Sequence, residues 1–412
     1  MAGLARWAMF ATLWMLAATG VALPASAQQT RERWVAAWAT SQLVPNEANT
    51  LPPETLTDAT LRQVVRVQIA GKRLRVRFSN AFGTAPLAIG AATIARSADL
   101  ASPRIDPATL RVLRFGGKPS AMIPAGAEYW SDPVDLAVPA GADLTLSIHF
   151  PQAPAQQTSH PGSRATSYTV HGDQTAATDL PNAAKVDRWY QIGGIETVDA
   201  RAAAVVVLGD SITDGYGVQP NTNARWTDAL QTRLRAAGMK LAVLNAGIGG
   251  GRLLNDGLGP NALARFDRDV LSPPGVTHLI VLEGVNDLGV LTREAPASPQ
   301  AHAALVEGMI GAYRQMVARA RAHGIKAIGA TILPYGRSDY YHPDAQNEAD
   351  RAAVNAWIRA PGNFDAVIDL DAAMRDPARP TFLRAEFDND GLHPSIAGYA
   401  AMAAAVPLAM LR

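Results

Sequence analysis

Residues 204–215, Ala-Val-Val-Val-Leu-Gly-Asp-Ser-Ile-Thr-Asp-Gly, join an apolar run to an abrupt polar turn. The run from Ala204 to Leu208 predicts a strand buried on both faces, which is typical of a parallel sheet. Open α/β sheets bind their ligands at the carboxyl ends of the strands, so Ser211 stands where a serine can meet a substrate. Gly-Asp-Ser is also common in turns, and these residues alone are compatible with an ordinary loop.

Strand and helix patterns alternate regularly after residue 200. Apolar runs predict strands at residues 204–208, 241–244, 278–282, 327–332 and 366–370. Apolar residues at helical spacing predict helices at residues 225–238, 262–271, 303–322, 350–358 and 396–411. This alternation indicates an α/β fold, with a parallel sheet covered by helices on both faces.

The first half of the chain has a hydrophobic period of two, which is typical of half-buried antiparallel strands. It predicts strands at residues 61–69, 72–78, 87–94, 110–115 and 144–150. Ala70-Gly71 favours a hairpin turn between the first two strands, and several short strands with turns between them favour a β-sandwich of the jelly-roll type. Residues 151–200 are polar and rich in Pro, Gly, Ser and Thr, and predict loops leading into a second domain.

Length and composition restrict the possible classes of protein. A chain of 412 residues exceeds one typical domain, so two domains are expected. The formal net charge of +1 provides no excess of basic side chains for phosphates, and no nucleic-acid partner is expected. The sequence contains no cysteine, which excludes disulfides, thiolate metal sites and cysteine nucleophiles.

The N-terminal segment has the pattern of a secretory signal peptide. Arg6 precedes an apolar stretch at residues 7–22, and Ala25-Ser26-Ala27 fits the small-residue site that signal peptidase cleaves. A membrane anchor is the alternative, but the stretch is shorter than the ~20 residues that a spanning helix needs. We therefore expect a signal peptide at 1–27, a β-sandwich domain with its linker at 28–200 and a catalytic domain at 201–412. The exported protein is expected in the periplasm or outside the cell.

Polar residues follow the predicted strands where serine ester chemistry needs them. Such chemistry requires a nucleophile, a base within hydrogen-bond reach and an acid that orients the base. Asp390 and His393 are three residues apart in a predicted turn, so one short segment can present both. The sequence thus predicts Ser211 as nucleophile, His393 as base and Asp390 as the group that fixes its tautomer.

The oxyanion of an acyl-transfer reaction needs hydrogen-bond donors that are not themselves nucleophiles. Three candidates follow the strands: the backbone N–H groups of Ser211 and Gly250, and the side-chain amide of Asn286. A glycine-rich loop allows the backbone to approach a substrate closely, although the same glycines also suit a tight strand-to-helix turn.

Four segments together resemble the signature blocks of the SGNH, or GDSL, hydrolase superfamily in their usual order. They are Gly209-Asp210-Ser211, Asn245-x-Gly247-x-x-Gly250, Gly284-x-Asn286-Asp287 and Asp390-x-x-His393. The resemblance covers residues 201–412 and implies a flavodoxin-like three-layer α/β/α fold with these residues in the roles given above. The sequences of the second and third blocks, together with a β domain before them, are most similar to secreted xylan-esterase-like members of the superfamily. The second block departs from the common pattern, since it has Gly-Gly-Gly-Arg where Ser-Gly-x-Thr is common.

The resemblance implies a carboxylic ester hydrolase that needs neither cofactor nor metal. Deacetylation of a carbohydrate such as acetylated xylan is the favoured reaction, and a general GDSL lipase or arylesterase is the alternative. The loop at 334–350, with Tyr335, Tyr340 and Tyr341, can line the cleft in either case. The alternative from another class is a glycan-binding protein without catalysis. Aromatic side chains of the first half could then stack on sugar rings, although each of them is more commonly a core residue. They are Trp34, Trp38, Trp130, Trp189 and Tyr190. Oligomeric state is left open.

Overall fold

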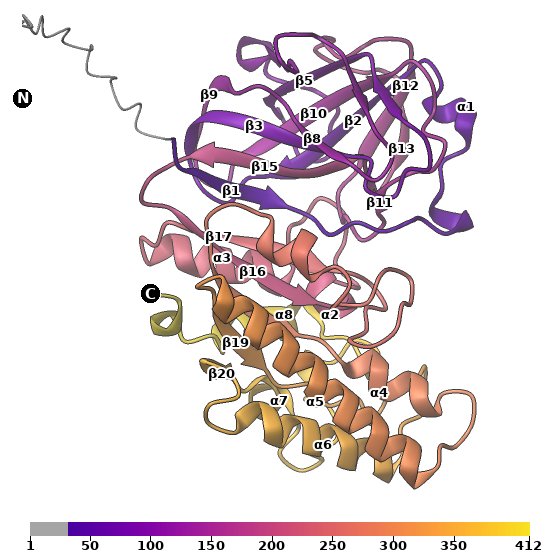
Figure 1. Ribbon diagram of the computed structural model, residues 1–412, viewed down its shortest axis with the longest axis vertical. Helices are drawn as coiled ribbons and strands as arrows, with labels where there is room; N and C mark the ends of the chain where they lie inside the picture. The colour runs from indigo at the N-terminus through magenta and orange to yellow at the C-terminus, as the bar shows by residue number, and fades with distance from the viewer. Residues whose placement is uncertain (1–31) are drawn as a thin grey trace, which may run out of the picture. The chain divides into compact units, whose positions relative to one another are not determined.

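Five parallel strands form the sheet that was predicted for the second half of the chain (Figure 1). A computed structural model describes residues 32–412, so the predicted signal peptide lies outside the described residues. The strands, in their order across the sheet, are β17 (Leu241–Gly247), β16 (Ala203–Gly209), β18 (Val276–Leu282), β19 (Lys326–Ala330) and β20 (Ala366–Ile368). The first strand in the sequence lies between the second and the third, which is the flavodoxin-like order. The α/β prediction is confirmed.

Strand β16 lies inside the sheet, between β17 and β18, and its side chains are buried on both faces. Val205, Val206, Val207 and Leu208 have no exposed surface. In the parallel register Gly209 lies beside the ends of β17 and β18, so the loops that leave these three strands begin at one edge of the sheet. This edge lies at a reversal of strand order, where open α/β sheets bind ligands.

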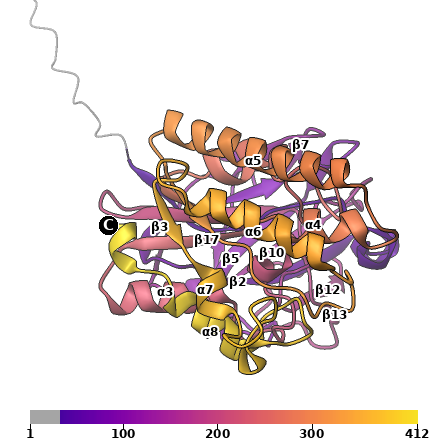
Figure 2. The ribbon, with the colours of Figure 1, turned by 90° about the horizontal axis from the view of Figure 1, so that it is seen from below.

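Helices cover the parallel sheet on both sides. Figure 2 shows α5 on one side of the sheet and α3 and α8 on the other. The longer helices are α3 (Trp226–Ala236), α4 (Val285–Thr292), α5 (Pro299–Ala322), α6 (Ala345–Arg359) and α8 (Ile396–Ala404), and the short ones are α1 (Pro53–Leu56), α2 (Ser211–Asp214) and α7 (Leu370–Met374). Helix α5 begins where the sequence contains standard start signals, since the Ser298 side chain accepts the N–H of Ala301 and Pro299 is the first helical residue.

The helix predictions were wrong in three details. The last helix ends at Ala404, and the chain turns at Pro407 before a 3₁₀ turn at Leu408–Leu411, because proline cannot continue the backbone hydrogen bonds. The predicted helix at 262–271 is regular only over Asp267–Leu271, as a short π-helical segment. Helices α1, α2, α4 and α7 were not predicted, since each has at most eight residues, too few for a clear helical repeat in the sequence.

The first half folds mainly into two antiparallel sheets (Figure 1). One contains β1 (Trp34–Ala39), β15 (Ile192–Val198), β3 (Gly71–Ser79), β8 (Glu128–Trp130) and β9 (Val134–Val138). The other contains β13 (Ala184–Val186), β12 (Ser167–His171), β2 (Ala59–Arg66), β10 (Asp143–Phe150), β5 (Ala91–Arg96) and β6 (Arg111–Val112). Two small pairs join β11 (Ser159–His160) to β14 (Trp189–Tyr190) and β4 (Leu87–Ile89) to β7 (Ala121–Ile123). The predicted β-rich region is confirmed, and its jelly-roll connectivity stays a prediction.

Three predictions for this half were wrong. Residues 87–94 are not one strand, because the chain breaks at Gly90 into β4 and β5, which pair with strands of different sheets. Strands β2 and β3 do not form a hairpin, because β2 pairs with β10 and β12 while β3 pairs with β15, β8 and β9. The residues between β2 and β3 therefore cross from one sheet to the other. The segment 151–200 is not only a connection, since β15 lies between β1 and β3 in the first sheet. Gly193 and Gly194 interrupt the apolar pattern of β15, and pairing with two neighbouring strands overrides their weak strand preference.

The two halves of the described chain share one continuous cluster of buried hydrophobic side chains. Strand β1 reaches the parallel sheet directly, since Thr40 bridges to Asn245 and the N–H of Ala36 donates to the carbonyl of Pro274 over 2.9 Å. Residues 33–412 accordingly form one compact unit. No helix within residues 32–412 is long and apolar enough to cross a bilayer.

Candidate active site

Ser211 is the first residue of α2, directly after strand β16. The Asp210 side chain accepts the N–H of Ile212 over 2.8 Å and so caps this helix. Gly215 ends the helix in a left-handed conformation. Short caps at both ends thus hold the Ser211 side chain at the edge of the sheet.

Ser211, His393 and Asp390 form a continuous hydrogen-bonded relay. The Ser211 hydroxyl donates to Nε2 of His393 over 2.9 Å, and Nδ1–H of His393 donates to the Asp390 carboxylate over 2.9 Å. The other Asp390 oxygen accepts the backbone N–H groups of His393 and Leu392, at 2.8 and 3.1 Å. The structure brings together the three residues that the sequence predicted as a triad, in the order that nucleophile activation requires.

The surroundings of the relay favour a neutral imidazole beside an ionised carboxylate. Burial lowers the pKa of His393, the Asp390 carboxylate acts in the opposite direction, and the Arg164 cation lowers the pKa further. Burial by itself would raise the pKa of Asp390, but hydrogen bonds from the backbone and ring of His393 hold it below its ordinary value. Near neutral pH, His393 is therefore able to accept the proton of Ser211.

The predicted oxyanion donors lie around the same space. Neither the backbone N–H of Ser211 nor that of Gly250 has an acceptor among the described residues. Gly250 has φ of +68°, a left-handed conformation that side chains rarely adopt. Asn286 is buried and follows β18 in helix α4. All three residues border one cavity together with His393.

Tyr341 fixes the orientation of the Asn286 carboxamide. Its hydroxyl donates to Oδ1 of Asn286 over 2.6 Å, and Nδ2 of Asn286 donates one hydrogen to the carbonyl of Gly251 over 2.7 Å. Because Nδ2 carries two hydrogens, the second stays available for a substrate oxygen. Tyr341 itself packs closely over Gly289, where a Cβ would lie 2.3 Å from the ring. The sequence placed Tyr341 in the cleft but gave no sign of this contact.

Several buried acids lie beneath the relay. Burial raises the pKa of Asp210 to about 7 and that of Asp287 to about 6. It also raises the pKa of Glu283 well above its ordinary value, and the nearby Asp210 adds to this effect. Asp287 accepts the backbone N–H of Leu253 over 2.8 Å, and Arg265 contacts Glu283 at 3.4 Å. These groups support the loop after β17 and do not touch the cavity.

The cavity in front of the relay has a volume of about 730 Å3 and a mixed lining. Leu258, Val290 and Leu392 provide apolar surface, whereas Arg252, Arg293 and Arg337 provide positive charge. Tyr340 and Tyr341 line it as predicted, but Tyr335 does not, since it is buried behind the cavity. Within residues 32–412, no three His, Asp or Glu side chains lie close enough together to hold a metal ion.

Tyr216 is a site residue that the sequence analysis missed. Its ring stacks on His393 with centroids 4.0 Å apart, yet 45% of the residue is exposed. Its position directly after Gly215, the end of the motif around Ser211, was the available signal. In contrast, most of the aromatic candidates of the first half serve the core: Trp38, Trp189 and Tyr190 are buried, and the rings of Trp38 and Trp189 pack edge to face at 5.0 Å.

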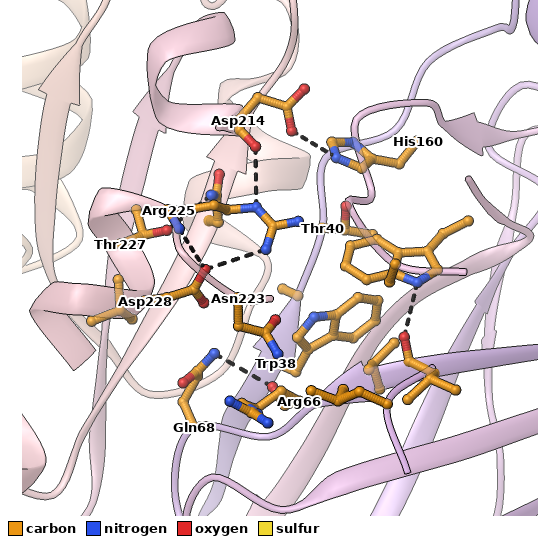
Figure 3. Close-up of a pocket in the computed structure, with 18 of the residues that line it drawn as sticks. Trp38, Thr40, Arg66, Gln68, His160, Asp214, Asn223, Arg225, Thr227 and Asp228 are labelled. Carbon is orange, nitrogen blue, oxygen red and sulfur yellow. Dashed lines mark hydrogen bonds and ion pairs between the residues drawn. The ribbon is translucent and has the colours of Figure 1, made fainter. Parts of the chain in front are cut away.

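The antiparallel region touches the helix that carries Ser211. His160 donates from one ring nitrogen to the Ser41 carbonyl over 2.7 Å, and its Nε2 lies 2.9 Å from the Asp214 carboxylate (Figure 3). Asp214 is the last residue of α2. Arg225, which precedes α3, donates to the Asp214 carbonyl over 3.1 Å in the same cluster. Only the fold brings His160 to α2, since the two are more than fifty residues apart in the chain.

One family model matches the second half of the chain. Residues 207–401 match the model of the GDSL-like Lipase/Acylhydrolase family, which supports the resemblance to GDSL hydrolases stated above. No curated protein matches the chain.

Solved structures that are similar to about half of this chain include proteins from three bacteria. A GDSL-like lipase from Bacteroides thetaiotaomicron is 22% identical, with 50% of this chain and 87% of that chain covered and a TM-score of 0.37. A lipase/acylhydrolase from Enterococcus faecalis is 24% identical, with 49% and 92% covered and a TM-score of 0.36. A catalytic mutant of an acetylxylan esterase from Geobacillus stearothermophilus is 21% identical, with 49% and 91% covered and a TM-score of 0.38.

Proposed function

We propose that this protein is a serine esterase that hydrolyses carboxylic esters through a covalent acyl-enzyme. The hydrogen-bonded relay from Ser211 through His393 to Asp390 carries the proposal, because it lies at the wall of an open cavity with two unpaired backbone N–H groups beside it. The family match over residues 207–401 supports the same reaction class.

In the first step, the Ser211 oxygen attacks the ester carbonyl carbon while its proton moves to Nε2 of His393. The negative charge that develops on the carbonyl oxygen receives hydrogen bonds from the N–H groups of Ser211 and Gly250 and from Nδ2 of Asn286. Asp390 stabilises the imidazolium through Nδ1–H. The bond to the alcohol then breaks, and His393 returns the proton to the departing alcohol oxygen.

In the second step, water replaces the alcohol. His393 takes a proton from this water, the resulting hydroxide adds to the acyl carbon, and the bond to the Ser211 oxygen breaks. The proton on His393 moves to Ser211, which releases a carboxylic acid and restores the enzyme. The same donors stabilise the oxyanion in both steps.

An acetylated carbohydrate such as acetylated xylan is the substrate class that we favour. Tyr216 offers an exposed aromatic face beside His393, on which a sugar ring can stack, and three arginines line the cavity. A general lipase or arylesterase is the second candidate, supported by the exposed Leu258 and the neighbouring Val290 at the cavity. A glycan-binding protein without catalysis is the third possibility that the experiments below address.

The proposal includes three further properties of the protein. They are membership of the xylan-esterase-like subfamily, export after cleavage at Ala27, and a boundary near residue 200 between an accessory domain and the catalytic domain. The boundary is consistent with the end of β15 at Val198 and the start of β16 at Ala203. Mass analysis of the mature N-terminus after expression with the full leader tests the export prediction.

The direct test compares acetyl, butyryl and octanoyl p-nitrophenyl esters with acetylated xylan. We expect a preference for acetyl esters and release of acetate from xylan. In Ser211→Ala we expect a loss of at least about a thousandfold, because the nucleophile is removed while the small side chain fits the strand end. Preference for octanoyl esters with no acetate release would favour the lipase alternative, and equal activity of Ser211→Ala would refute the mechanism.

A further inference from the structure

A second hollow, of about 160 Å3, adjoins the catalytic cavity. Gly249 and Leu258 border both spaces. The rest of the hollow is lined largely by the antiparallel region, including Asn46, Asn49 and Arg164. Substrate bound at Ser211 can therefore extend onto a surface that the parallel-sheet region does not provide.

The first residues of the loop at 160–166 contact the catalytic region. His160 holds the Asp214 carboxylate, as described above (Figure 3). Gly162 packs so closely on Asp214 that a Cβ would lie 1.8 Å from its carboxylate oxygen. A residue larger than glycine would require the loop or the Asp214 carboxylate to move.

The end of the same loop is fastened equally well. The Ser163 carbonyl accepts a hydrogen bond from the Arg225 guanidinium, and the Arg164 carbonyl accepts the N–H of Asn221 over 2.8 Å. Thr166 and the Asn221 side chain exchange two further hydrogen bonds, at 2.9 and 2.8 Å. Arg164 is thus presented from a rigid loop.

The backbone conformation of Arg164, and the lack of bonding partners for its side chain in the described part of the chain, suggest that it binds a ligand. Its φ of +48° is a left-handed conformation that is costly for a residue with a Cβ. Its buried Nε has no hydrogen-bond partner, and no carboxylate pairs with its guanidinium among the described residues. The one described carboxylate that lines the hollow, Asp214, is already bonded to His160.

The position of Arg164 relative to the relay identifies the part of the substrate it can meet. Its guanidinium carbon lies 6.0 Å from the centroid of the Tyr216 ring, and that ring stacks on His393 at 4.0 Å. His393 must protonate the departing oxygen, so the alcohol part of the ester lies beside His393. From there the alcohol extends over the exposed ring of Tyr216 toward Arg164.

The lining of the catalytic cavity carries both signs of charge, with three arginines and the carboxylates of Asp339 and Asp390. Arg293 pairs with Glu294, and Arg337 lies 3.5 Å from Asp388, but Arg252 has no carboxylate partner among the described residues. Arg252 and Arg164 both lie near the glycine loop at 249–250. The Arg252 cation favours the ionised carboxylates of Asp256 and Asp287, whereas Arg164 forms no ion pair within the part of the chain that the structure describes. Guanidinium groups bind carboxylates in a planar, paired geometry and bind neutral hydroxyls more weakly.

We propose that Tyr216 and Arg164 form a subsite for the alcohol part of the ester, and that this alcohol is a sugar carrying a carboxylate, as in an acetylated uronic acid. The antiparallel region then belongs to the substrate site through Arg164. This inference rests on the proposed esterase function and specifies its substrate.

The test compares two acetylated sugars that differ only at C6, methyl glucuronoside with a carboxylate there and methyl glucoside with a hydroxymethyl group, as substrates of the full-length mature protein. We expect the intact protein to have the higher kcat/KM on the glucuronoside. Arg164→Asn should lower the ratio of the two kcat/KM values about tenfold, because one charge-assisted contact is lost. Asparagine tolerates the left-handed backbone of this position, and Arg164→Gly, which suits it better, serves as a second variant.

Arg104→Asn is the matched control, since Arg104 is an exposed arginine of the same region, and it should keep the ratio unchanged. Equal ratios in the intact protein and in Arg164→Asn would overturn the subsite. Calorimetric binding of deacetylated methyl glucuronoside to Ser211→Ala, with and without Arg164→Asn, tests the subsite without turnover. If no ester is hydrolysed but glucuronoside binding depends on Arg164, the esterase function is refuted and the subsite is supported. If esters are hydrolysed and neither the kcat/KM ratio nor the binding depends on Arg164, only the subsite is refuted.

Discussion

The two walls of the candidate site are held in place by different means. On one wall, Asp390 and His393 lie three residues apart in a single turn, and Ser211 is fixed by the caps of its own short helix. On the other wall, Arg164 depends on a loop that is bonded to residues more than fifty positions away, such as Asp214 and Asn221. Local turns thus set the proposed chemistry, whereas contact between the two regions sets the proposed recognition of substrate.

Removal of the base should have the largest effect. We expect His393→Gln to lower kcat for p-nitrophenyl acetate by about 10⁴-fold or more, because no group remains to accept the Ser211 proton. The fold should persist, as judged by an unchanged far-ultraviolet circular dichroism spectrum. A loss of less than about a hundredfold would mean that another group acts as base.

Loss of the contact between the two regions should mainly affect stability. His160 is 5% exposed and bonds both Ser41 and Asp214, so His160→Ala leaves the buried Asp214 carboxylate without that partner. We expect the free energy of unfolding to fall by about 3 kcal/mol in urea titrations. The control is His171→Ala, whose side chain is 82% exposed, with a change within about 0.5 kcal/mol. Equal effects of the two substitutions would show that the His160 contact does not hold the regions together.

Tyr341 tests how far the first wall depends on a distant side chain. Tyr341→Phe keeps the ring over Gly289 but removes the hydrogen bond that orients Asn286. We expect kcat to fall about tenfold with little change in KM, while Asn286→Ala sets the upper limit at about a hundredfold or more. An unchanged kcat in Tyr341→Phe would show that the Gly251 contact alone orients the carboxamide.

The pH profile should show the smallest effect and links the two walls. Only neutral His393 can act as base, and its lowered pKa keeps it neutral at lower pH, so kcat/KM should rise with pH through a midpoint below the ordinary value of about 6.5. Arg164→Asn removes a nearby cation that disfavours the imidazolium, so the midpoint should move upward. A midpoint above about 6.5 in the intact protein would contradict the effect of burial.

The parallel sheet was predicted with few errors because its signals are local. Each strand is a short apolar run between turn residues, and burial on both faces requires such a run. The antiparallel region was predicted less well. Strand β15 contains two glycines and becomes a central strand only by pairing with β1 and β3, and the change of sheet between β2 and β3 leaves no trace in the alternation of side chains.

The candidate site shows the same division. Ser211, Gly250, Asn286, Asp390 and His393 were all named from the sequence, and the structure places all five around one cavity. Ser211, Gly250 and Asn286 closely follow strands that end at a common edge, whereas α7 and a 3₁₀ turn separate β20 from Asp390 and His393. Tyr216 was missed although it adjoins the motif around Ser211. Arg164 and His160 had no signal, since a polar loop in the first half gives no indication of the surface on which it docks.

The sequence by itself determined the order of strands and helices in the second half and the chemical groups at their ends, because hydrophobic period and capping residues act over a few positions along the chain. Only the tertiary structure decided which strands of the first half share a sheet, how Tyr341 orients Asn286, and that Arg164 stands beside Tyr216. Those arrangements depend on contacts between residues distant in the chain, and their free energy comes from burial and pairing that no short stretch of sequence contains.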